Sequence, residues 1–120
     1  MIVVYGLKNC DAVRKARQWL AGEGIACRFH DFRADGLTGA MVARWVAELG
    51  WPALVNRRSA TWRQLGEADR AIDDDAAAVA LMAGHPALIK RPLIDLGCCR
   101  LVGFDQAVRD RLAETASAVP

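Results

Sequence analysis

The sequence lacks a long apolar run, an excess of either charge and a paired cysteine spacing. Its main apolar stretches, Met1–Leu7 and Ala76–Ala83, are much shorter than the roughly 20 residues that a membrane-spanning helix needs. The first stretch has no basic residue ahead of it and no small-residue cleavage site behind it, which indicates a buried strand rather than a secretory signal. We therefore expect a cytoplasmic protein that does not act at a membrane.

The charge is almost balanced, with 16 basic and 14 acidic residues and a net charge of +2. This balance gives no reason to expect direct binding to nucleic-acid phosphates. Charged residues make up 25% of the chain and hydrophobic residues 53%, which is typical of a globular protein and not of a disordered one. A length of 120 residues predicts one domain with its own core.

Four cysteines are too few for a disulfide scaffold in a chain of this length. They also lack the C-x-x-C spacing of a zinc site, because Cys98 and Cys99 are adjacent while Cys10 and Cys27 stand alone. Three successive aspartates, 73–75, cannot all converge on one metal ion. They precede a predicted helix, where their negative charges would interact favourably with the positive end of the helix dipole. We expect reduced thiols and no metal centre, which leaves open whether one cysteine carries chemistry.

The first third of the chain predicts a β-α-β unit. Ile2–Tyr5 is β-branched and aromatic and ends at Gly6, which favours a buried strand. Asp11–Leu20 has apolar residues at helical spacing, and Ile25–Phe32 alternates as a strand does. Such a unit favours parallel strands and a right-handed crossover.

The remaining chain predicts a helical middle, then a hairpin, then a last helix. The middle segments end at glycines or begin at capping residues, and the hairpin turns at Gly97. The predicted elements are a helix capped by Thr38 and ended by Gly50, a short helical turn from Thr61 to Leu65, a helix over Ala76–Met82, strands at Ala87–Ile94 and Cys99–Val102, and a helix over Phe104–Leu112 followed by frayed residues 113–120.

Cys10 is the residue best placed for chemistry, because it follows a strand and a short loop and directly precedes a predicted helix. The first N–H groups of a helix have no partner within it and carry the positive end of its dipole. Thiolates in such positions are stabilised by those groups, and only the thiolate is nucleophilic. Lys8 and Arg14 could add positive potential, whereas Asp11 opposes it. The alternative interpretation is a small buried side chain without chemistry.

Two basic clusters could complete a site. Arg57-Arg58 follows the helix ending at Gly50, and Lys90-Arg91-Pro92 precedes a predicted strand. Arginine suits an oxyanion or carboxylate because its planar guanidinium donates two parallel hydrogen bonds. The alternative for each cluster is a solvated surface with no ligand.

The sequence resembles the arsenate reductase-like family, and especially its Spx/YffB branch. The resemblance lies in ordered motifs that span nearly the whole chain. It implies a thioredoxin-like (glutaredoxin-like) α/β fold with a mixed four-stranded sheet, formed as a single domain over 1–120 with a helical insertion at about 38–84. The motifs are Tyr5-Gly6-Leu7-Lys8-Asn9-Cys10-Asp11 with Arg14-Lys15-Ala16, Phe29-His30-Asp31-Phe32-Arg33 with Asp35-Gly36-Leu37, Leu49-Gly50-Trp51, Asn56-Arg57-Arg58, Thr61-Trp62-Arg63-Gln64-Leu65, His85-Pro86, Ile89-Lys90-Arg91-Pro92-Leu93 and Gly103-Phe104.

The same resemblance implies that Cys10 is the reactive cysteine and that Pro92 is a cis proline facing it. We therefore expect a YffB-like thiol reductase that uses one nucleophilic cysteine and glutathione as co-substrate, with no tightly bound cofactor. The substrate would be a small disulfide or oxyanion, and glutaredoxin is a further candidate partner. Besides Cys10, the expected binding residues for substrate or glutathione are Lys8, Asn9, Arg57, Arg91 and Pro92.

Two other functions stay open. In glutathione-dependent arsenate reductases three arginines hold the oxyanion; Arg91 matches one, the second falls at Asn56, and the third falls near Gly103. Spx proteins contact RNA polymerase and carry a C-x-x-C redox switch, which reads Cys10…Val13 here. The alternatives are thus an arsenate reductase and an RNA polymerase-binding adaptor without that switch.

Overall fold

The computed structural model describes residues 2–118, with side chains through residue 115. The chain divides into two compact units: Met1–Ala34 together with Arg91–Pro120, and Asp35–Lys90. We call them the sheet unit and the helical unit and describe each by itself. The predicted insertion at about 38–84 falls within the helical unit.

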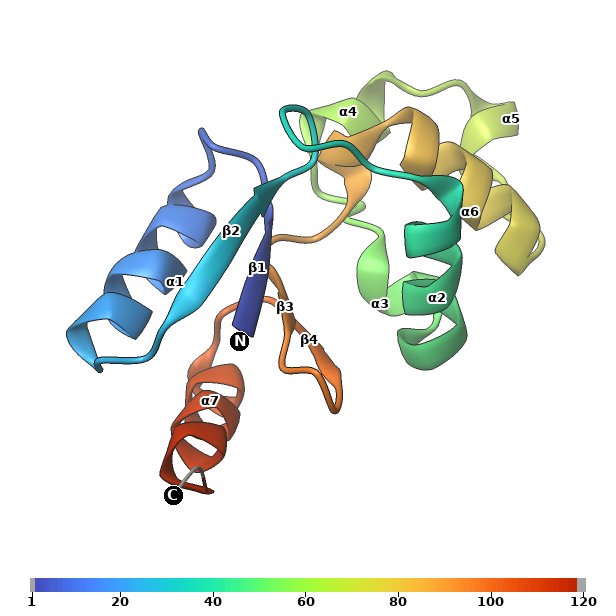
Figure 1. Ribbon diagram of the computed structural model, residues 1–120. Helices are drawn as coiled ribbons and strands as arrows, with labels where there is room; N and C mark the ends of the chain where they lie inside the picture. Colours follow the sequence, from blue (N-terminus) through green and yellow to red (C-terminus); the bar gives the residue numbers. More distant parts are fainter. Residues whose placement is uncertain (1, 119–120) are drawn as a thin grey trace. The chain divides into compact units, whose positions relative to one another are not determined.

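The sheet unit is built on a mixed four-stranded sheet with strand order β2-β1-β3-β4 (Figure 1). β1 pairs in parallel with β2, and β3 is antiparallel to both β1 and β4. The parallel pairing predicted for the first two strands is therefore confirmed. The strands are β1 (Ile2–Gly6), β2 (Cys27–Asp31), β3 (Leu93–Asp95) and β4 (Arg100–Val102).

Two helices, α1 (Asp11–Gly22) and α7 (Gln106–Ala118), share one hydrophobic core with this sheet. Alternate residues of β1 face the core, as the period of a strand requires, while the helical residues recur at three- and four-residue intervals. The helices thereby hold their N-terminal ends in fixed positions against the sheet. The buried residues of this core are Ile2, Val4, Val13, Leu20, Ile94, Val108 and Leu112.

Gly6, the last residue of β1, allows α1 to lie close to the strand. A Cβ atom added at Gly6 would come within 2.5 Å of Val13 Cγ2, a distance that real Cβ contacts do not show. The absence of a side chain at Gly6 therefore fixes how closely the first turn of α1 approaches the end of β1.

The helical unit has its own core between α2 and α6, which pack against each other. α2 contributes Val42, Trp45 and Val46, and α6 contributes Ala78 and Met82, all buried. Two four-residue helices, α3 and α5, were not expected from the sequence, because segments this short carry no periodic signal. The elements are α2 (Gly39–Leu49), α3 (Trp51–Leu54), α4 (Ala60–Gln64), α5 (Glu67–Arg70), α6 (Asp75–Gly84) and the 3-10 turn η1 (Pro86–Leu88).

Side-chain caps start three of these helices. The predicted cap at Thr38 is confirmed, since its Oγ1 accepts a hydrogen bond from Met41 N–H at 3.1 Å. Asp74 Oδ1 accepts from Ala77 N–H at 2.8 Å, which confirms the capping role expected within the triple aspartate. The short helix expected from Thr61 instead begins at Ala60, because Ser59 is the residue that caps it.

The strand expected over Ala87–Ile94 is wrong for its first part. Residues 86–88 form η1, and Ile89 makes only an isolated bridge with Val55, so that β3 begins at Leu93. Proline explains the difference: Pro86 has a fixed φ that suits the start of a helical turn, and Pro92 has no N–H to donate to a sheet.

The last helix also differs from the expected Phe104–Leu112. α7 begins two residues later and continues to Ala118, so residues 113–118 are helical; residues 119–120 lie outside the described residues. Asp105 accounts for the start, because its Oδ1 accepts from Val108 N–H at 3.0 Å and caps the helix. Over residues 2–118 no helix has the length and apolar character needed to cross a membrane.

Candidate active site at the start of α1

Cys10 is the N-cap residue of α1, which confirms the position expected from the sequence. Its N–H donates to the carbonyl of Leu7 at 3.2 Å, closing a tight turn, and its carbonyl accepts from Arg14 N–H at 3.0 Å as the first helical bond. The residue is partly buried against the core of the sheet unit. The sulfur makes no capping hydrogen bond, so the expected bonds from the first helical N–H groups are absent in this structure.

The positive charge of Arg14 is paired with Asp11 on the same helix. Its Nη1 lies 2.7 Å from Asp11 Oδ1, in an exposed ion pair between residues three apart. The positive potential expected from Arg14 and the negative potential expected from Asp11 therefore largely cancel at this surface.

Asp31, at the end of β2, holds the loop that carries Cys10. Its Oδ2 accepts a hydrogen bond from Lys8 N–H at 3.0 Å, which ties the β1–α1 loop to the neighbouring strand. Its Oδ1 accepts from the N–H groups of Arg33 at 2.7 Å and Ala34 at 3.1 Å. One buried carboxylate thus fixes the backbone on both sides of the site.

The surroundings of Asp31 favour its ionised form. Burial alone raises the pKa of this carboxyl, but the three backbone N–H donors and the charge of Arg33 together hold its pKa below the ordinary 3.8. The carboxylate is therefore negative at neutral pH. Its charge is balanced by the dipoles of the three N–H groups that donate to it, so its role is to hold the loop.

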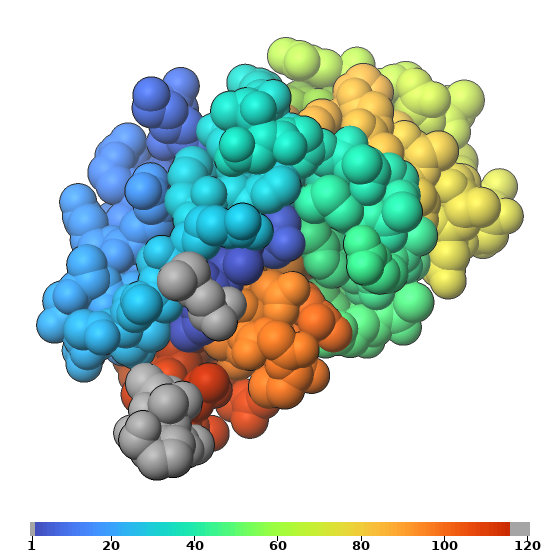
Figure 2. Space-filling view, in the orientation of Figure 1, coloured from blue at the N-terminus to red at the C-terminus, as the bar shows by residue number. Residues whose placement is uncertain are grey.

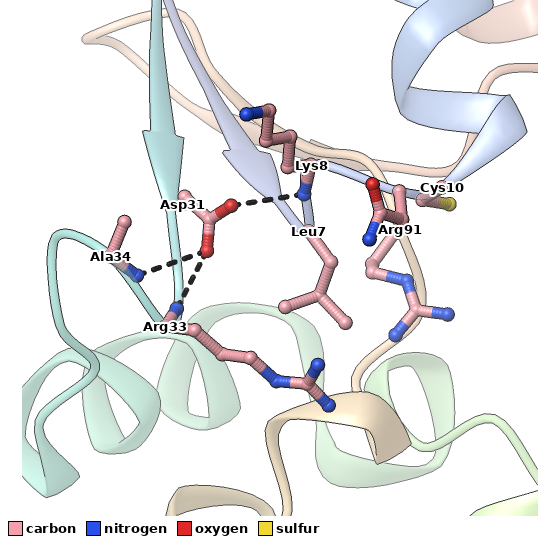
Figure 3. A pocket seen from close by; sticks show the side chains of 8 residues that line it. Leu7, Lys8, Cys10, Asp31, Arg33, Ala34 and Arg91 are labelled. Carbon is pink, nitrogen blue, oxygen red and sulfur yellow. Dashed lines mark hydrogen bonds between the residues drawn. The ribbon is translucent and has the colours of Figure 1, made fainter.

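An open pocket of about 390 Å³ lies in front of Cys10, lined by residues 7–10, by Asp31, Arg33 and Ala34, and by Arg91. Figure 3 shows the guanidinium groups of Arg33 and Arg91 on the same side of the loop, with Arg91 beside Cys10. The Lys8 side chain points away from both guanidinium groups (Figure 3). A pocket lined by a cysteine and two arginines suits a substrate that carries negative charge near an electrophilic atom.

Most of the expected site residues come together in this pocket. Lys8, Asn9, Cys10 and Arg91 all line it. The Arg91–Pro92 peptide bond is cis, as expected, and Pro92 is buried, with its carbonyl accepting from Gly103 N–H at 2.8 Å.

Arg57 belongs to the helical unit, where its guanidinium lies over the ring of Trp51 at 5.2 Å from the centroid. Arg57 therefore has a contact of its own in that unit, and its expected role in binding a substrate at Cys10 stays a prediction.

Sequence reasoning missed Asp31 and Arg33 as parts of the site. Both stand in the Phe29–Arg33 motif, but the motif was used only for the resemblance. The usable signal was an aspartate at the end of a strand followed by a turn, because such side chains accept hydrogen bonds from N–H groups two and three residues on. Nothing in the spacing indicated the third donor, Lys8, which is 23 residues away.

The mixed sheet with flanking helices and a cysteine at the start of α1 define an α/β protein of the thioredoxin-like class. The chain belongs to the ArsC family, whose sequence model matches residues 5–111. This assignment confirms the family resemblance and the fold class expected from the sequence.

Three relatives illustrate the similarity. A structure of a YffB protein has a TM-score of 0.87 and is 42% identical, covering 92% of this chain and 97% of its own. The solution structure of an arsenate reductase (ArsC) related protein from Brucella melitensis has a TM-score of 0.76 and is 36% identical, covering 94% of both chains. An uncharacterised protein of Haemophilus influenzae is 44% identical over 106 residues, which are 88% of this chain and 93% of that protein.

Proposed function

We propose that this protein is a thiol-dependent reductase of the YffB kind, in which Cys10 is the nucleophile and glutathione the reductant. The observation that carries the proposal is the pocket that brings Cys10 together with Arg33 and Arg91. Membership of the ArsC family and similarity to a YffB protein support it.

The first step is attack by the Cys10 thiolate on one sulfur of a small disulfide. A bond forms between Cys10 Sγ and that sulfur, the original S–S bond breaks, and the second sulfur leaves as a thiolate. Arg91 and Arg33 would bind the anionic groups of the substrate, and Asn9 would offer its amide beside the sulfur. Arg57 is proposed as a further cation for the substrate.

The second step restores the enzyme. A glutathione thiolate attacks the substrate sulfur of the mixed disulfide, a glutathione-substrate disulfide forms, and Cys10 leaves as a thiolate. A second glutathione reduces that product to free thiol and oxidised glutathione. Two electrons pass from two glutathione molecules to the substrate disulfide, and no tightly bound cofactor takes part. Glutaredoxin could replace glutathione in the resolving step.

The test is reduction of 3,3′-dithiodipropionate, a small disulfide with two carboxylates, by glutathione, followed through NADPH consumption by added glutathione reductase. Cys10→Ser should abolish the activity above background. Arg91→Gln should lower kcat/KM about 10- to 100-fold, the range expected for losing charge-assisted hydrogen bonds. Arg28→Gln is the control, because Arg28 is an exposed arginine of β2 that does not line the pocket, and it should change kcat/KM less than about threefold.

The proposal is wrong if Cys10→Ser retains the activity of the wild type. A second assay with arsenate in place of the disulfide, again with glutathione, distinguishes a disulfide reductase from an arsenate reductase. The two guanidinium groups lining the pocket would suit either substrate. If glutathione supports turnover of arsenate but not of the disulfide, and Arg91→Gln loses that turnover, the protein is an arsenate reductase instead.

A further inference from the structure

A second pair of thiols lies outside the pocket of Cys10, in the hairpin between β3 and β4. Cys98 is exposed and Cys99 is half-buried, and their sulfur atoms are 3.6 Å apart. The turn that presents them is well fixed: Gly97 has φ +88°, its N–H donates to Asp95 Oδ1 at 2.7 Å, and Leu96 N–H donates to the Cys99 carbonyl at 2.9 Å.

An arginine of α7 lies against this pair. Arg111 Nη2 donates a hydrogen bond to Cys99 Sγ at 3.3 Å, across 12 residues of sequence. The hairpin and α7 adjoin each other in the space-filling view, orange against red (Figure 2). The bond to Cys99 raises the pKa of the Arg111 guanidinium above its ordinary value, and a cation in this position attracts an anionic sulfur.

The other charged groups around the pair are already engaged. Glu114 Oε2 lies 3.8 Å from Arg111 Nη1, on the same helix. Arg100 and Asp95, at the base of the hairpin, form their own pair at 3.5 Å. Both carboxylates thus have a charged partner, and the Arg111 guanidinium contacts Cys99 directly through its Nη2.

The geometry disfavours a direct disulfide but suits a bridging atom. Consecutive Cα atoms are about 3.8 Å apart, shorter than the usual range of about 4.4–6.8 Å for disulfide-bonded cysteines. Two sulfur bonds of about 2.3 Å to one common atom, with the sulfurs 3.6 Å apart, would enclose an angle of about 100°. That angle is close to tetrahedral, so one atom can bind both sulfurs with little movement.

The number of available ligands narrows the choice of that atom. Among residues 2–118 there is no cluster of three or more histidine, cysteine or acidic side chains that could hold a metal ion. A structural zinc site, which takes four protein ligands, is therefore incomplete at Cys98 and Cys99. By contrast, a trivalent atom that already carries one substituent needs only two protein sulfurs, which Cys98 and Cys99 can supply.

We propose that Cys98 and Cys99 form a dithiol site for a soft, trivalent thiophile of the organoarsenical class, with Arg111 favouring attack by Cys99. In the binding step two As–S bonds form and the two S–H bonds and the As=O bond break. The two protons leave with the oxide oxygen as one water. Arsenic stays trivalent and no oxidant is needed. The site is separate from Cys10 and does not depend on the function proposed for it.

The probe is phenylarsine oxide, and the readout is intact mass together with the dissociation constant. The wild type should bind one phenylarsenic unit with loss of two thiol hydrogens and one oxide oxygen. Cys98→Ser and Cys99→Ser should each bind about 100-fold more weakly, since one sulfur cannot chelate. Cys10→Ser should bind like the wild type, which separates this site from the proposed active site.

Arg111→Gln should slow capture about two- to fivefold at neutral pH, because it removes the cation beside Cys99. Arg28→Gln is the matched control, an exposed arginine on β2, and it should leave the rate unchanged. Equal affinity of the wild type and Cys98→Ser would overturn the proposal, as would an adduct that is lost in Cys10→Ser. Circular dichroism checks that each variant is folded.

Discussion

Asp31→Asn tests whether one carboxylate holds the loop that carries Cys10. Asparagine keeps an oxygen that can accept from Arg33 and Ala34, but it places an amide NH₂ against the N–H of Lys8. The variant therefore loses one hydrogen bond and the charge that strengthens the other two. Since bonds to charged groups contribute about 1.5–3 kcal/mol each, the free energy of unfolding should fall by about 2 kcal/mol.

Urea unfolding followed by circular dichroism measures this loss. Asp110→Asn, on the exposed face of α7, is the matched control and should change the free energy of unfolding by less than about 0.5 kcal/mol. The loop should also hold Cys10 less firmly, so that alkylation of Cys10 by iodoacetamide differs from that of the wild type. A change below about 0.5 kcal/mol for Asp31→Asn would refute the role assigned to this carboxylate.

The difference in unfolding free energy between the wild type and Asp31→Asn should depend on pH in a defined direction. The pKa of Asp31 is lower in the folded chain than its ordinary 3.8, so ionisation stabilises the fold above that pH. This contribution is lost as the pH falls through the folded pKa, which lies below 3.8. The difference in unfolding free energy between the wild type and Asp31→Asn should therefore be full at pH 7 and narrow below pH 3.8. A difference that stays constant down to the acid transition would contradict this assignment.

Two further predictions concern packing and capping. Gly6→Ala should cost about 1–3 kcal/mol of unfolding free energy, because its Cβ meets Val13, while Gly22→Ala, with open space around it, should be neutral or stabilising by up to about 1 kcal/mol. Asp74→Ala should cost about 1 kcal/mol by removing the cap of α6, and Asp73→Ala only a few tenths. Urea unfolding checks both pairs, and equal effects within either pair would contradict the reasoning.

The sheet unit was largely predictable because its signals are local. Ile2–Gly6 reads as a buried strand, and a cysteine directly before the periodic residues Val13, Ala16 and Leu20 marks the start of α1. The parallel pairing of β1 and β2 follows from the helix that connects them.

The hairpin strand was misjudged where local and long-range effects compete. Leu88 and Ile89 are apolar, and Ile89 is β-branched, so the pair is typical of a strand, but both are buried in the helical unit. Prolines at positions 86 and 92 separate them from β3. Pattern alone does not say which core an apolar run will join.

The candidate site was predictable at Cys10 and only in part around it. Its position depends on one helix start, which the sequence marks clearly. Asp31 acts through a hydrogen bond from Lys8 N–H, 23 residues away, and such a contact is set by strand pairing and not by spacing. The sulfur contact of Arg111 is of the same kind, since it joins α7 to the hairpin.

The most direct test of the central claim is to incubate the protein with oxidised glutathione and map the adduct by mass spectrometry. Cys10 should acquire one glutathione in the wild type, and also in a variant that carries both Cys98→Ser and Cys99→Ser. Cys10→Ser should show no adduct on the corresponding peptide and no disulfide reductase activity. Glutathione found only on Cys27, Cys98 or Cys99, with Cys10 unmodified, would contradict the assignment of Cys10 as the nucleophile.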